Sequence, residues 1–167
     1  VNIETCKGSV LIQDKAVVAD SLDLIIDGAP LHLTGKIDLG VEGYAYNTDL
    51  TLENLSLTPF LATFAPQLRQ QIQAQIRLLK ATANGRGITM PSLKKNLVGN
   101  LEVELDSLHL QGIEGLQEFA TKWQIPEIRE LHFRTGHLQA KAAAGLVKIP
   151  DLSLAGDDLR INASGQM

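Results

Sequence analysis

Apolar and polar residues alternate one by one along much of this chain. Because successive side chains of a strand point to opposite sides, each such segment predicts a strand with one apolar face and one polar face. The clearest segments lie at residues 22–26, 31–39, 49–53, 102–106, 131–134 and 159–162. Turn-forming residues separate several of them, at Asp27-Gly28, Thr135-Gly136 and Gly156-Asp157-Asp158. The pattern predicts an antiparallel sheet with one solvated face.

Two segments have helical spacing instead. After Thr58-Pro59, a pair suited to a helix start, apolar residues recur every fourth position across 58–79. Pro66 lies inside this run, so we expect it to kink the helix or to divide it in two. The second helix is predicted at 113–124, before Ile125-Pro126. Between them we expect a short strand around Ile88 and a loop or helical turn at 91–95.

Two gapless self-alignments suggest internal repeats. Residues 147–167 align with 17–37, and residues 100–110 align with 47–57. The first alignment predicts that Gly35 and Gly165 occupy equivalent strand positions. The expected fold is therefore mainly β with some α (α+β): a strongly twisted antiparallel sheet or β-groove with two or three amphipathic helices. We assign 1–167 to a single domain with weak repeat halves at about 1–80 and 97–167.

Composition narrows the function classes. With 44% hydrophobic and 20% charged residues, the 167-residue chain has the make-up of one folded domain. Its net charge of -4 gives no basic surface for nucleic acid. Cys6 is the single cysteine and cannot form an internal disulfide. The chain begins at Val1 rather than methionine, and we expect it to be a piece of a longer protein.

The sequence contains no recognisable catalytic or metal-binding motif. Four histidines, His32, His109, His132 and His137, are scattered over predicted strands, whereas a zinc site needs three or four converging ligands. Gly85-Arg86-Gly87 is not followed by the Gly-Lys-Ser/Thr of a phosphate loop. We therefore predict no catalytic residue, no metal and no cofactor, and a protein that is not an enzyme.

The run 128–167 has the pattern of a phenylalanine-containing strand, a glycine turn, a short apolar strand, and then a strand pair that ends in a Gly-x-apolar step. In this pattern it resembles the C-terminal part of the AsmA family of bacterial envelope proteins. Gly35-Lys36-Ile37-Asp38-Leu39 resembles the same ending in an earlier copy, so the resemblance covers chiefly 15–57 and 97–167. It implies an extended, curved β-groove in the periplasm of a Gram-negative-type bacterium. It also implies a parent protein anchored in the inner membrane by a part outside this sequence, and a link to phospholipid movement toward the outer membrane and outer-membrane homeostasis.

The apolar strand faces need a cover. About a dozen large aliphatic residues left in water would forfeit roughly 20–30 kcal/mol, against a net domain stability of about 5–15 kcal/mol. Two helices cover less than half of such a sheet. We expect the rest of the apolar face to be shielded from water by curling of the sheet, by neighbouring repeats or by acyl chains. A self-sufficient α+β core remains an alternative.

Two function hypotheses follow. The first is a groove that shields phospholipid acyl chains, lined by Leu22, Leu24, Leu31, Leu33, Leu152, Leu154, Leu159 and Ile161. On this hypothesis, Leu154→Asp removes lipid without unfolding the domain. The second is a structural or interaction module whose open sheet edges pair with envelope proteins.

Overall fold

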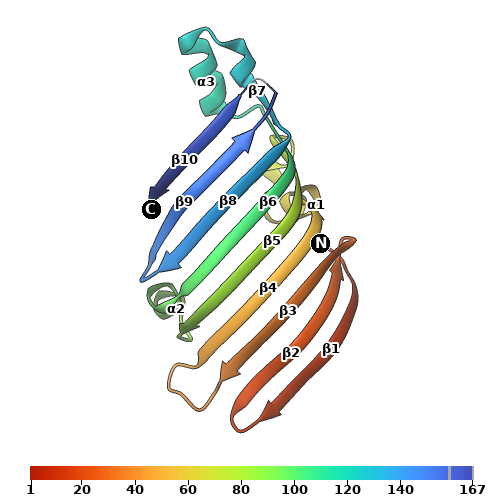
Figure 1. Cartoon of the computed structure of the whole chain (residues 1–167), viewed down its shortest axis with the longest axis vertical. Helices are drawn as coiled ribbons and strands as arrows, with labels where there is room; N and C mark the ends of the chain where they lie inside the picture. Colours follow the sequence, from red (N-terminus) through yellow and green to blue (C-terminus); the bar gives the residue numbers. More distant parts are fainter. Residues whose placement is uncertain (158, 167) are drawn as a thin grey trace.

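A computed structural model describes residues 1–157 and 159–166, and it forms one open antiparallel sheet with three short α-helices (Figure 1). Nine strands are neighbours in the order β1-β2-β3-β4-β5-β6-β8-β9-β10, and β7 pairs with the C-terminal end of β6. The strands are β1 (Ile3–Gln13), β2 (Ala16–Ile26), β3 (Ala29–Asp38), β4 (Ala45–Ser56), β5 (Ile72–Arg86), β6 (Val98–Gln111), β7 (Glu130–Phe133), β8 (Thr135–Ala143), β9 (Leu146–Ala155) and β10 (Arg160–Gln166). The helices are α1 (Leu57–Phe64), α2 (Met90–Asn96) and α3 (Glu114–Trp123), with 3-10 turns η1 (Pro66–Leu68) and η2 (Pro126–Arg129). The mainly β, antiparallel α+β class predicted from the sequence is confirmed.

The register places an unbroken aliphatic surface on one face of the sheet. Residues directly opposite each other on paired strands project to the same side, so pairing can be followed from strand to strand. One row comprises Leu24, Leu31, Leu52, Leu79, Val103, Leu138 and Leu152, and the next row comprises Leu22, Leu33, Leu50, Ala81, Leu101 and Ala140. We call these two rows the aliphatic strip. On the opposite face, the corresponding row is Asp23, His32, Thr51, Lys80, Glu102, Gln139 and Asp151.

Two helices cover part of the apolar face. Leu57 and Phe60 of α1 pack against a buried cluster of Ala29, Leu52, Leu55, Ile76 and Val103. Leu116 of α3 packs against a second cluster, formed by Leu131, Phe133 and Leu154. The predicted amphipathic helix at 113–124 is thus confirmed as α3. Within the part of the chain that the structure describes, no helix is long and apolar enough to span a membrane.

The prediction of a helix throughout 58–79 is wrong beyond its first part. The helix α1 ends at Phe64, the turn η1 follows at Pro66, and residues from Ile72 onward form the fifteen-residue strand β5. A spacing of four residues is also a multiple of two, so Ile72 and Ile76 share a face in a strand as well as in a helix. Pairing with β4 and β6 decides between the two.

For residues 87–96, the expected strand around Ile88 is wrong, whereas the expected helical turn is confirmed. Ile88 lies outside any strand and is 67% exposed, in the bend after β5. The helical turn expected at 91–95 is present as α2. Thr89 caps this helix: its side chain accepts a hydrogen bond from the Ser92 backbone N–H, and the Ser92 hydroxyl accepts one from the Thr89 N–H.

The three predicted turns have different outcomes. Asp27 and Gly28 both have positive φ, 49° and 80°, as a tight two-residue hairpin requires, and they connect β2 to β3. Gly156 donates its N–H to the Leu159 carbonyl in the turn between β9 and β10, while Asp158 lies outside the described residues.

The turn predicted at Thr135-Gly136 is wrong, because both residues belong to β8. A Cβ on Gly136 would lie 2.7 Å from Leu154 Cδ2 and 3.0 Å from Leu105 Cδ1. Glycine is present at this position so that neighbouring leucines can close over the strand, not because the chain turns there.

The two hairpins of the first self-alignment share a register. Ala19 pairs with Gly35 in the β2–β3 hairpin, and Ile149 pairs with Gly165 in the β9–β10 hairpin, which are positions separated by the same offset. Each hairpin also has its register shift next to this glycine pair. The final aligned residue, Met167, lies outside the described residues. A repeat of the whole unit stays a prediction.

Candidate functional site

Seven of the eight residues predicted to line a groove lie on the apolar face. Leu22, Leu24, Leu31 and Leu33 lie on β2 and β3, whereas Leu152, Leu154 and Ile161 lie on β9 and β10. The two groups are separated by β4, β5, β6 and β8, so they occupy opposite ends of the surface. The eighth residue, Leu159, precedes β10 and is 38% exposed, beside Ile125 and Ile128 around a hollow of about 650 Å³.

Sequence reasoning missed the middle of this surface. The residues that connect the two groups are Leu50, Leu52, Leu79, Leu101, Val103 and Leu138. Alternation marked several of them as strand residues, but it could not say which strands are neighbours. Leu79 was hidden further by its assignment to a helix.

The apolar face has a covered row and a more open strip. Leu55, Ile76, Leu105, Gly136, Leu154 and Ile161 form the row beside the strip on the side of α1 and α3. Leu154 in this row is 8% exposed and contacts the cluster around Phe133. Leu154 therefore lies in a closed part of the apolar face rather than in an open groove. We now expect Leu154→Asp to destabilise the fold, since a buried unpaired carboxylate costs several kcal/mol. Most strip residues, in contrast, are partly exposed.

The molecule exposes much more surface than a compact monomer of its size. Its accessible surface is 10,817 Å² for a mass of 18.1 kDa. A compact monomer of that mass exposes about 8,100 Å², which leaves an excess of roughly 2,700 Å². Such an excess is expected of a sheet whose apolar face is only partly covered.

The opposite face carries histidine–carboxylate pairs. His32 Nδ1 lies 2.7 Å from Asp23 Oδ1, and this hydrogen bond is the main reason why the pKa of Asp23 is lowered. His137 lies between Asp151, at 2.9 Å, and Glu102, at 3.3 Å. Hydrogen bonds to Asp151 and then to Glu102 raise the pKa of His137. In all three pairs the carboxylate lies on a strand next to that of its histidine, on the polar face.

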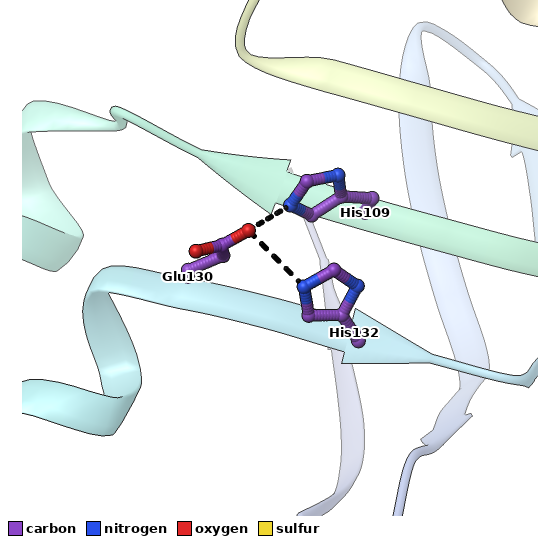
Figure 2. A group of neighbouring side chains, drawn as sticks. All are labelled: His109, Glu130 and His132. Atoms are coloured by element: carbon purple, nitrogen blue, oxygen red, sulfur yellow. Dashed lines mark hydrogen bonds and ion pairs between the residues drawn. The ribbon is translucent and has the colours of Figure 1, made fainter.

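The remaining two histidines converge on one carboxylate at the β6–β7 pair (Figure 2). His109 Nε2 lies 2.8 Å and His132 Nε2 lies 3.2 Å from the same Glu130 oxygen, Oε1. The two imidazole rings stack with centroids 4.0 Å apart. Hydrogen bonds from His109 and then His132 lower the pKa of Glu130. The sequence placed both histidines on strands correctly, but gave no sign that residues 23 positions apart would meet.

Comparison with known proteins adds no family. No family model, no curated protein and no solved structure matches this chain. The resemblance to the AsmA family therefore stays a prediction from the sequence.

Proposed function

We propose that the aliphatic strip holds the acyl chains of phospholipids, and that this chain is a non-enzymatic segment of an envelope protein for phospholipid transfer or outer-membrane homeostasis. The observation that carries the proposal is the unbroken strip itself, which crosses seven strands and is only partly covered by α1 and α3. The periplasmic location and the inner-membrane anchor of the parent protein rest on the family resemblance alone.

The chemistry of the strip favours a hydrocarbon ligand over a protein partner. Its thirteen residues are leucine, valine and alanine, so its side chains offer no hydrogen-bond donor or acceptor. Protein interfaces depend on tryptophan, tyrosine and arginine anchors, which the strip does not contain. An acyl chain needs only an aliphatic surface that excludes water.

The dimensions of the strip also suit acyl chains. Seven strands spaced at about 4.8 Å span roughly 30 Å, about twice the thickness of one hydrocarbon leaflet. An extended chain could therefore lie across the strands with its headgroup beyond the strip. Transfer would proceed by partitioning along the leucines, with no covalent step.

The test compares two isomeric residues that are neighbours in β2. Leu24 is paired with Leu31 in the strip, whereas Ile25 is paired with Pro30 and points to the opposite face. Both side chains are partly buried. We expect Leu24→Asn to weaken binding of a fluorescent fatty acid by roughly tenfold or more, because it removes one leucine from the contact surface. Ile25→Asn should leave the affinity unchanged.

Thermal unfolding of both variants provides the stability control. Mass spectrometry of lipids extracted from the purified wild-type protein provides the second measurement. Equal affinity in the two variants, or purified protein that neither carries phospholipid nor binds the fatty acid, would overturn the proposal.

Pairing through a sheet edge is the second candidate function. Among the described residues, β1 has β2 as its one neighbour, and all eleven of its residues are exposed. Ile3, Val10 and Ile12 are 60%, 53% and 77% exposed on this edge. An unpaired apolar edge is a template for another strand. Val10→Pro would remove a backbone donor from β1, and it should abolish partner capture without affecting fatty-acid binding if edge pairing is the function.

A further inference from the structure

We propose that His109, Glu130 and His132 form a binding site for a divalent transition-metal ion, and that Zn²⁺ fits it best. The site lies on the polar face of the sheet, opposite the aliphatic strip, and it does not depend on the proposed lipid function. It revises the prediction of a chain without a metal.

The backbone alone brings the three side chains together. His109 of β6 and His132 of β7 are direct cross-strand partners, so their side chains project to the same side. Glu130 precedes His132 by two positions in β7, which places it on that side as well. In Figure 2 one carboxylate oxygen of Glu130 faces a ring nitrogen of each histidine. Two paired strands, rather than a loop, therefore fix the spacing.

The ligand atoms have the separation that a small ion requires. Zn²⁺ binds imidazole nitrogen and carboxylate oxygen at about 2.0–2.2 Å, which puts the ligands of a tetrahedral site about 3.3 Å apart. Here Glu130 Oε1 lies 2.8 Å from His109 Nε2 and 3.2 Å from His132 Nε2. One ligand atom from each residue falls within 4.8 Å of the other two. A small opening of the cluster would admit the ion.

The donor types select the class of metal. Two imidazoles with one carboxylate suit Zn²⁺ and its neighbours in the transition series. Ca²⁺ and Mg²⁺ prefer six or more oxygen ligands and are disfavoured. The side chains of His109, Glu130 and His132 are 23%, 56% and 66% exposed, so water can reach a fourth coordination position.

The ion would also cross-link a weak point of the sheet. The strand β7 has four residues, and α3 and η2 make an excursion from the sheet between the end of β6 and the start of β7. A metal bound across His109 and His132 would clamp the base of this excursion. Zn²⁺ should therefore raise the melting temperature of the protein.

Calorimetric titration with zinc chloride tests the site in the full 167-residue chain. All proteins would carry Cys6→Ser, because Cys6 is an exposed thiol that can bind zinc by itself. We expect one saturable site. His109→Gln, His132→Gln and Glu130→Gln should each weaken it by roughly tenfold or more, since a direct ligand contributes at least as much as its outer-shell support.

His137→Gln is the matched control. His137 is also held between carboxylates on the polar face, but it lies outside the cluster. It should leave the affinity unchanged. Co²⁺ provides an optical measurement, since its visible absorption should appear with the wild-type cluster and disappear in the three ligand variants. No saturable binding, unchanged affinity in the ligand variants, or an equal loss in His137→Gln would overturn the proposal.

Discussion

Truncation of two leucines in the aliphatic strip measures how far the apolar face is covered. Leu52 on β4 is 5% exposed and belongs to the buried cluster beneath Phe60 of α1. Leu33 on β3 lies in the adjacent row of the strip and is partly exposed. Leu52→Ala and Leu33→Ala remove the same atoms from the same face. A difference in the free energy of unfolding that the two variants lose therefore reports how deeply each leucine is buried.

The two costs should differ clearly. Leu52→Ala leaves a cavity enclosed by packed neighbours, and such truncations cost about 2–5 kcal/mol of the free energy of unfolding. At Leu33 solvent already reaches the side chain, so the cavity contribution is absent. The remaining loss of partly buried surface is about 1 kcal/mol. We therefore expect a difference on the order of 2 kcal/mol between the variants.

Urea unfolding followed by circular dichroism gives both free energies, provided that the slope with urea concentration stays the same in the two variants. The measurement should be repeated at a low and a high protein concentration, since self-association would cover the strip. If Leu33→Ala lowers the free energy of unfolding as much as Leu52→Ala at both concentrations, the strip is shielded from solvent within the single molecule. The inference of an exposed aliphatic surface would then be refuted.

Two further predictions concern the polar face and the covered row. The folded-state pKa of His137 is raised by Asp151 and Glu102 above its unfolded value. Its stabilisation is therefore complete below the unfolded pKa and is lost as the pH rises through the folded pKa. His137→Gln should lower the melting temperature more at about pH 5 than at about pH 8, and a pH-independent effect would contradict this. Gly136→Ala should destabilise the protein by roughly 1–3 kcal/mol in urea unfolding, because the new Cβ meets Leu154. An unchanged midpoint would show that Leu154 moves aside without cost.

Strand periodicity predicted the class of the fold because apolar and polar residues alternate with the buried and solvated faces of a strand. The alternation at residues 22–26 and 31–33 gave β2, β3 and the face that each apolar side chain occupies. It failed at 72–79, where apolar spacing of four residues satisfied both a helix and a strand. Pairing with β4 and β6 makes this segment a strand. The pattern within one segment does not show which strands will lie beside it.

The same limit explains what was missed at the sites. Register decides that Leu79 lies between Leu52 and Val103, and register also makes His109 face His132. The second pairing depends on the length and course of α3 and η2, which return the chain to β6. Gly136 was misread for a related reason: glycine marks a turn in many sequences, whereas here it admits Leu154 and Leu105.

The strand order has a consequence for how the protein gains and loses its structure. From β1 to β6, and again from β8 to β10, each strand pairs with the one that follows it in the chain. Ordering can therefore spread by local hairpins, one strand at a time, as in a solenoid, with little loop entropy lost at each step. Stability should in turn be graded along the sheet. Backbone amides of β5 and β6, where Ile76 and Val103 are buried, should exchange with solvent last. Those of β1 and β10 should exchange first, so the molecule would fray from its edges inward.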